Sequence, residues 1–176
     1  MRDAPGDGGK PGSGQSEPGH AESGGLAPDV FAGCLIEHHP DYPGWHDWRL
    51  GEEGGYNRAV LGTVLVRRED NATVRTRIFP QAHHLNQSGH VHGGITLGFV
   101  DVSMFAGAAL ITGLPMQQGV TIEVSCQFTG AGHSARPLDA VVRLIRETGR
   151  MGFAQGQVVQ GEDVIAGFSG ILRKPR

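Results

Sequence analysis

The sequence is poor in cysteine and has little net charge. Its two cysteines, Cys34 and Cys126, cannot make a disulfide framework, so we expect a reducing, cytoplasmic setting. A net charge of −3 gives no indication of nucleic-acid binding, and no nucleic-acid partner is expected. The first residues are polar and glycine-rich, without the apolar segment of a signal peptide. A length of 176 residues suits one domain with a sizeable core.

The longest apolar segment is at the lower limit for a membrane span. Residues 95–111 are barely long enough to cross a bilayer. Asp101 lies near the centre of this segment, where a carboxylate costs about 2.5–3.5 kcal/mol on insertion scales. Several glycines also favour a buried helix of a soluble domain, so no membrane partner is expected.

The beginning of the chain differs in composition from the rest. Residues 1–25 contain mainly glycine, proline, serine and scattered charge, and they can bury little apolar surface. We therefore predict a disordered tail, with a docking or regulatory segment as the alternative. Apolar residues return after it, and residues 26–176 are predicted to form the folded domain. Its first part should contain a short helix over 29–37 and a loop that carries Trp45 and Trp48.

The pattern of the remaining residues predicts strands around one helix. Segments rich in β-branched or alternating apolar residues predict six strands, over 59–67, 72–78, 120–128, 138–148, 151–160 and 164–172. Between the second and third of these lies the apolar helix of residues 95–111, which ends before Gly113. This order is typical of an α+β domain in which a curved antiparallel sheet wraps around one long central helix.

Asp101 is the one charged residue in the predicted central helix. Its neighbours Phe99, Val100, Val102 and Met104 are apolar. A helix with apolar residues on all sides belongs in the interior of a domain. Burial of an ionised carboxylate without partners is costly, so Asp101 is either well hydrogen-bonded or kept for a function.

The residues around this helix resemble the signature of a known family. The motif consists of Asn86, Gly89, His92, Gly93, Gly94 and Asp101. It is similar to that of hotdog-fold acyl-CoA thioesterases, in the phenylacetate-pathway (PaaI-like) branch, and the resemblance covers residues 61–172. The resemblance implies a single hotdog domain that hydrolyses an acyl-coenzyme A to free acid and CoA, with no metal or organic cofactor. It also implies a homodimer or a homotetramer.

The chemistry of thioester hydrolysis gives these residues roles. The backbone N–H of Gly93, at the helix start, is the expected oxyanion donor, with the side-chain amide of Asn86 beside it. Gly93 and Gly94 have no side chains, so a substrate can approach the backbone closely. Asp101 would either activate a water as general base or attack directly through a mixed anhydride, and we favour the water. Thr121 stands where relatives often carry a hydroxyl that holds this water, but an ordinary strand residue is an equal alternative.

The spacing of Gly93 and Asp101 predicts a site that two subunits share. Eight residues of helix rise about 12 Å, so these two groups of one chain cannot both reach one thioester carbon. The simplest arrangement is a two-fold dimer in which each site takes Gly93 from one subunit and Asp101 from the other. The acyl group would lie between the two central helices, against Phe99 and Met104. Small residues such as Gly98 would permit close packing of these helices.

Several residues and functions remain as alternatives. His92 is expected to hold the turn around Gly93 by a hydrogen bond rather than to act as a base. His90 and His92 have the spacing of metal ligands, but no nearby carboxylate completes a metal site. Arg150 could contact the phosphates of coenzyme A. The alternative functions are a non-catalytic acyl-CoA-binding hotdog protein, a hotdog hydratase and a small metal-dependent β-barrel enzyme.

Overall fold

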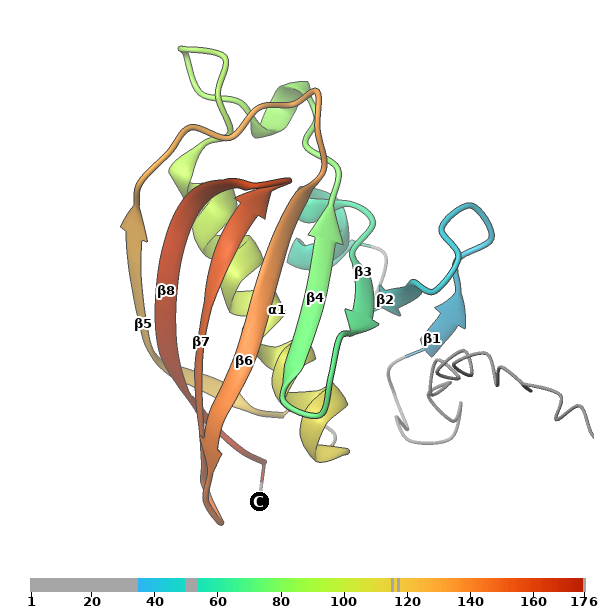
Figure 1. The fold of residues 1–176 in the computed structure, drawn as a ribbon, viewed down its shortest axis with the longest axis vertical. Coiled ribbons are helices and arrows are strands. Elements are labelled where there is room, and N and C mark those ends of the chain that lie inside the picture. Colours follow the sequence, from blue (N-terminus) through green and yellow to red (C-terminus); the bar gives the residue numbers. More distant parts are fainter. Residues whose placement is uncertain (1–34, 50–53, 115, 117, 176) are drawn as a thin grey trace, which may run out of the picture.

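The computed structural model describes residues 35–49, 54–114, 116 and 118–175. In these residues eight antiparallel strands form one sheet, in the order β1-β2-β3-β4-β6-β7-β8-β5, which curves around one long helix (Figure 1). The elements are β1 (Leu35–His38), β2 (His46–Arg49), η2 (Asn57–Leu61), β3 (Leu65–Arg68), β4 (Thr73–Ile78), η3 (Ala82–His84), α1 (Gly93–Thr112), β5 (Val120–Phe128), β6 (Leu138–Glu147), β7 (Met151–Gln160) and β8 (Asp163–Arg173). The predicted α+β architecture, a curved antiparallel sheet around one central helix, is confirmed.

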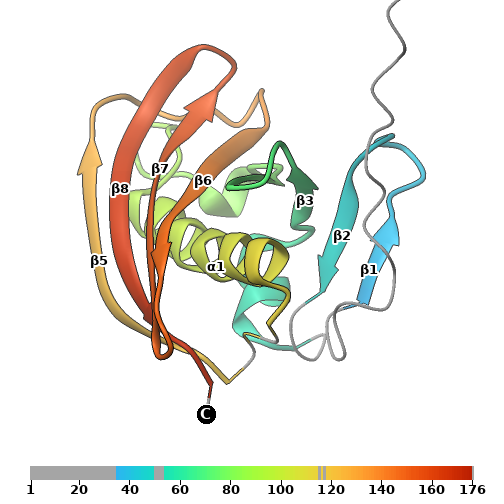
Figure 2. The same cartoon turned by 60° about the horizontal axis from the view of Figure 1, so that its bottom comes forward.

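Local signals in the sequence set both ends of α1. His92 precedes the helix in an extended conformation, and Gly113 ends it in the left-handed region at a φ of 71°. The length of α1 and its mean hydropathy of 1.8 would suit a membrane span, but 61% of the apolar window is buried inside the fold. The sheet curves around this helix, as Figure 2 shows.

The sheet-facing side of α1 forms the core together with the inner face of the sheet. Phe99, Val100 and Met104 are fully buried in this core. A buried polar contact lies within it, because the hydroxyl groups of Ser103 on α1 and Thr76 on β4 are 2.6 Å apart. This contact ties the helix to the middle of the sheet.

The strands after α1 agree closely with the sequence-based prediction. β5 and β7 have the predicted ends, and β6 and β8 differ from the prediction by one residue at one or both ends. The turn between β6 and β7 contains Gly149 and Arg150. β5 is the last strand in the sheet order and pairs with β8. No described strand pairs with the outer side of β5, which is therefore an open edge of the sheet.

Two predictions for the first part of the chain are wrong. Residues 35–37 were expected in a helix but belong to β1, which forms a hairpin with β2 and extends the sheet beyond β3. Residues 59–61 were expected in a strand but belong to η2, which packs against α1 and ends at Gly62 with a φ of 73°. The predicted tail of residues 1–25 and the rest of the predicted first helix, residues 29–34, lie outside the described residues.

Trp45 attaches the β1–β2 hairpin to the rest of the sheet. This side chain is 4% exposed, and the guanidinium groups of Arg67 and Arg77 lie 4.7 and 4.5 Å from its ring centre. Such contacts of a cation with an aromatic face are stabilising. Asp139 on β6 holds Arg77 with a hydrogen bond of 2.6 Å, which raises the pKa of Arg77. Trp45 lies in the loop just before β2, as predicted, whereas Trp48 belongs to β2, and both side chains are buried.

Candidate active site

The loop that leads into α1 is organised by the side chain of Asn86. Its Oδ1 accepts hydrogen bonds from the backbone N–H groups of Ser88 and His90, at 2.9 and 3.1 Å. Gly89 completes this turn with a φ of 77°, a conformation that glycine adopts easily. Within the described residues, the NH2 group of Asn86 has no protein partner. It is available as a donor just before the start of the helix.

The first turn of α1 leaves one backbone donor free. His92 Nδ1 accepts a hydrogen bond of 2.9 Å from the N–H of Gly94, and the His92 carbonyl accepts from Ile95 and Thr96. The N–H of Gly93 has no partner in the part of the chain that the structure describes. Gly93 is therefore the donor of this turn that a ligand oxygen can reach. Because Nδ1 accepts, the neutral ring of His92 carries its proton on Nε2.

The face of α1 that the sheet leaves uncovered carries Asp101. Exposed or half-buried residues lie along it, each three or four positions from another member, and we call them the helix strip: Gly94, Leu97, Gly98, Asp101 and Phe105. Asp101 Oδ1 accepts a hydrogen bond of 2.5 Å from the hydroxyl of Thr121 on β5. The other carboxylate oxygen, Oδ2, has no partner among the described residues. The structure thus brings Thr121 to Asp101 and leaves one oxygen free to accept a proton.

Gly93 and Asp101 stay apart within one chain. They are separated by eight residues of the same helix, which is about 12 Å along its axis. Asn86 and His92 lie at the Gly93 end, whereas Thr121 lies at Asp101. A single chain therefore presents two separate halves of the predicted site.

Of the residues predicted to contact substrate, Phe99 and Met104 lie in the core, whereas Arg150 lies on the surface. Phe99 and Met104 are fully buried on the side of α1 that packs in the core, so they are not on the helix strip, and the prediction that they line the acyl site needs correction. Leu97, 42% exposed, and Gly98 take their place on the exposed side. Arg150 lies in the exposed turn between β6 and β7, where its carbonyl accepts from the N–H of Lys174 at 2.8 Å.

Two aromatic residues outside the sequence motif lie against glycines of α1. Ring atoms of Phe128, at the end of β5, are 3.4 and 3.6 Å from the position that a Cβ of Gly93 would occupy. The hydroxyl of Tyr56, just before η2, is 2.5 Å from the corresponding position of Gly98. Both aromatic side chains are more than half exposed, at 51% and 57%. These contacts join residues far apart in the sequence, so no local pattern predicts them.

Within the described part of the chain, other reactive side chains do not form a second centre near the helix strip. Among the residues that the structure describes, no group of three His, Cys, Asp or Glu side chains could hold a metal ion. His90 packs edge-on against His133, with ring centres 5.1 Å apart. Burial raises the pKa of the Cys126 thiol on β5, which keeps it protonated and weakly nucleophilic at neutral pH.

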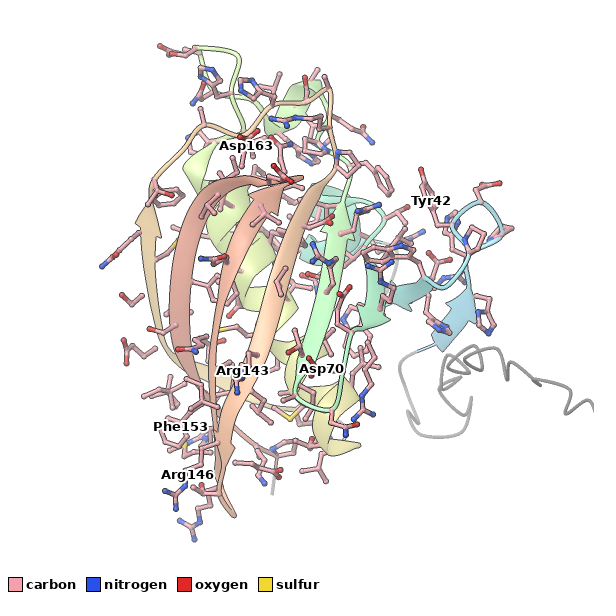
Figure 3. The ribbon with its side chains drawn as sticks, in the orientation of Figure 1. Tyr42, Asp70, Arg143, Arg146, Phe153 and Asp163 are labelled. Atoms are coloured by element: carbon pink, nitrogen blue, oxygen red, sulfur yellow. The ribbon has the colours of Figure 1, made fainter. Side chains whose placement is uncertain are left out.

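A cavity of about 590 Å³ lies on the outer face of the sheet. Its lining includes Ser125, Gln127, Gln155 and Arg143, and Figure 3 shows Arg143 on β6. This face is turned away from α1, and the lining contains neither a carboxylate nor a histidine. The cavity therefore offers no general acid or base for hydrolysis.

This architecture is similar to that of known thioesterases. Residues 88–166 match the model of the thioesterase superfamily. The candidate esterase PA0474 of Pseudomonas aeruginosa is 26% identical over 116 residues, which are 66% of this chain and 86% of that protein. The structure of zebra fish thioesterase superfamily member 2 is similar with a TM-score of 0.60 at 20% identity, covering 69% of this chain and 88% of that one. The PaaI protein of the E. coli phenylacetic acid degradation operon has a TM-score of 0.57 at 21% identity, covering 66% and 86%.

The fold and these matches define a hotdog domain with one central helix. Residues 88–166 match the thioesterase superfamily model and the fold is shared with solved thioesterase structures, in agreement with the resemblance found in the sequence. PaaI proteins, the branch that the sequence motif resembles, share this fold at 20–21% identity.

Proposed function

We propose that the protein is an acyl-CoA thioesterase with a site that two subunits share. The observation that carries this proposal is the arrangement on α1. A free backbone donor at Gly93 and a carboxylate at Asp101, oriented by Thr121, occupy the uncovered side of one helix about 12 Å apart. A second copy related by a two-fold axis would bring Gly93 of one subunit to Asp101 of the other.

The proposed reaction uses Asp101 as a general base. Asp101 Oδ2 takes a proton from water while the water oxygen attacks the thioester carbon. The carbonyl oxygen becomes an oxyanion that accepts hydrogen bonds from Gly93 N–H and the NH2 group of Asn86 of the partner's helix start. The intermediate then collapses to the carboxylic acid and breaks the C–S bond. The proton on Asp101 passes to the departing CoA sulfur, which restores the carboxylate.

The edge of the sheet supports association through β5. This strand of nine residues lies at the end of the sheet, and Val120, Ile122 and Phe128 on it are 39–51% exposed. A long edge with exposed apolar side chains favours pairing with another strand. The same strand carries Thr121, so pairing of two β5 strands would place the partner beside Asp101.

Arginines near the start of β5 support the proposal that the CoA phosphates bind at this end of the site. Val120 pairs with Arg173, which in turn pairs with Met151 next to Arg150. Arg146 lies at the lower end of the sheet in Figure 3, near the same turn. Arginine forms strong, paired hydrogen bonds with phosphate. Arg150 is accordingly proposed as a phosphate contact.

A free-thiol assay on a panel of acyl-CoAs, short, medium, long and aryl, tests this function. Asp101→Asn should lower kcat by about 10²–10⁴-fold, because it removes the general base. Acyl-CoA binding and the oligomeric state should persist in this variant, as measured by calorimetry and gel filtration. Glu162→Gln, in the exposed turn before β8, is the matched control and should behave as wild type.

Two outcomes would contradict the proposal in different ways. Turnover by Asp101→Asn at the wild-type rate would show that Asp101 is not the base. Tight binding of acyl-CoA by the wild type, without hydrolysis of any member of the panel, would instead support the non-catalytic acyl-CoA-binding alternative.

A further inference from the structure

Tyr56 rests against the uncovered side of α1 although it lies outside the sequence motif. It immediately precedes η2, the short helical segment that packs on α1, and its side chain is 57% exposed. Its hydroxyl lies 2.5 Å, and its ring 3.4 Å, from the position that a Cβ of Gly98 would occupy. An exposed aromatic ring is therefore seated on the helix at a place where only glycine leaves room.

Gly98 lies one helical turn before Asp101. Residues three apart on a helix have Cβ positions about 5–6 Å apart. The Tyr56 hydroxyl, 2.5 Å from the Cβ position of Gly98, is thus within about 8 Å of the Asp101 Cβ. Helical side chains lean toward the N-terminus, so the Asp101 carboxylate leans toward this turn. Tyr56 and the proposed base consequently border the same part of the helix strip.

Tyr56 and Thr121 approach the helix strip from different sides. Thr121 belongs to β5, whereas Tyr56 comes from the segment that leads into η2. In Figure 2, β5 lies to the left of α1 and the teal η2 segment lies below it. The uncovered part of α1 around Gly98 and Asp101 is therefore flanked by a strand on one side and an aromatic side chain on the other.

The two ends of the helix strip differ in chemistry. Toward the C-terminus of α1, a ring atom of Phe105 lies 2.9 Å from the position that a Cβ of Gly119 would occupy. Gly119 directly precedes β5, whose first residue pairs with Arg173 near the arginines proposed for the CoA phosphates. Toward the N-terminus, Leu97 and Gly98 offer an apolar surface that reaches Tyr56. If the CoA phosphates lie at the C-terminal end of the helix strip, the acyl group extends from Asp101 toward the N-terminal end of the strip.

We infer that Tyr56 is a specificity-determining residue that ends the acyl site and limits the length of the acyl group. This inference rests on the proposed thioesterase function. The side chain of Tyr56 stops an apolar chain that runs along the helix strip past Gly98. Tyr56 can occupy this position because Gly98 has no Cβ, so the phenol ring lies directly on the helix.

Chain-length profiles of Tyr56 variants test the inference. We would measure kcat/KM for straight-chain acyl-CoAs that increase by two carbons, with wild type, Tyr56→Ala and Tyr56→Leu. Wild type should show a sharp drop beyond one length. Both variants should move this drop to longer chains, with a gain of about tenfold or more for the first length that wild type rejects, since one methylene in an apolar pocket is worth about 10–200-fold.

Two further variants control for the position and the chemistry of the change. Tyr56→Phe shortens the side chain by one oxygen and should move the limit by at most one step of the series. Tyr42→Ala removes a tyrosine from the β1–β2 hairpin, which Figure 3 shows far from α1, and should leave the profile unchanged. Tyr56→Leu retains an apolar side chain against α1, so a result is obtained even if Tyr56→Ala does not fold.

The outcomes separate this inference from the proposed function. An unchanged length profile in both Tyr56→Ala and Tyr56→Leu, with wild-type activity on the preferred substrate, would overturn the role of Tyr56 and leave the thioesterase intact. A shift in Tyr42→Ala equal to that in Tyr56→Ala would overturn it as well. Absence of hydrolysis by the wild type across the whole series would overturn the proposed function itself.

Discussion

Gly98 and Gly107 lie on the same helix, and we predict that alanine stabilises the protein at Gly98 but not at Gly107. A Cβ at Gly107 would lie 2.8 Å from Cγ1 and 3.2 Å from Cβ of Val142. Val142 is buried in β6, and its β-branched side chain has little rotational freedom. At Gly98 the atom in the way is the hydroxyl of Tyr56, the tip of an exposed side chain that can rotate.

The expected magnitudes follow from two opposing terms. Replacing glycine by alanine inside a helix gains about 1 kcal/mol of unfolding free energy. Overpacking a buried site costs about 1–3 kcal/mol. Gly98→Ala should therefore stabilise the protein by up to about 1 kcal/mol, whereas Gly107→Ala should range from neutral to about 2 kcal/mol less stable. The two variants should differ by about 1–3 kcal/mol.

Urea unfolding followed by tryptophan fluorescence measures this difference, because Trp45 and Trp48 are buried. All proteins are compared at one subunit concentration, since association adds to the apparent stability. If all variants have the same slope of unfolding free energy against urea concentration, differences between their unfolding midpoints report differences in stability. The reasoning about Val142 would be refuted if Gly107→Ala unfolded at the same or a higher urea concentration than Gly98→Ala.

Two buried hydrogen-bonding groups give further predictions for the same assay. Thr76→Val removes the 2.6 Å contact with Ser103 and should lower the unfolding free energy by about 1 kcal/mol; no loss would mean that this contact adds nothing to stability. Gln160→Ala removes hydrogen bonds to the backbone N–H and carbonyl of His133 and to the carbonyl of Arg136, and should cost about 3 kcal/mol. It should also speed proteolysis in this loop, and an unchanged cleavage rate would contradict the clamping role of Gln160.

The strands of the second half were predictable because their signals are local. β5 and β7 have alternating or β-branched residues between clear turn residues, and the structure matches their predicted ends. Residues 59–61 misled the prediction because Val60 and Leu61 suit a strand as well as a helix. Packing of η2 against α1 and the positive φ of Gly62 decide the conformation there, and neither is visible in the sequence.

The candidate site was predictable in part for a similar reason. The motif that contains Gly93 and Asp101 is local, and the Asp101–Thr121 contact follows once β5 is placed beside α1. Phe99 was assigned to the acyl site because a helix that is apolar on all sides gives no indication of which side the sheet covers. The sequence does not predict the place of Tyr56, because its position depends on the packing of two segments about 40 residues apart.

In the proposed enzyme, association and chemistry are coupled through β5. The open edge of this strand favours pairing with a second copy, and the strand also carries Thr121, which orients Asp101, and Phe128, which lies on Gly93. Pairing of two β5 strands would therefore act on both halves of the site at once. The partial exposure of Asp101 in one chain is then expected, because a carboxylate on the surface of one subunit is enclosed only when the partner's helix covers it. The same enclosure would exclude bulk water from the oxyanion and strengthen its hydrogen bond to Gly93.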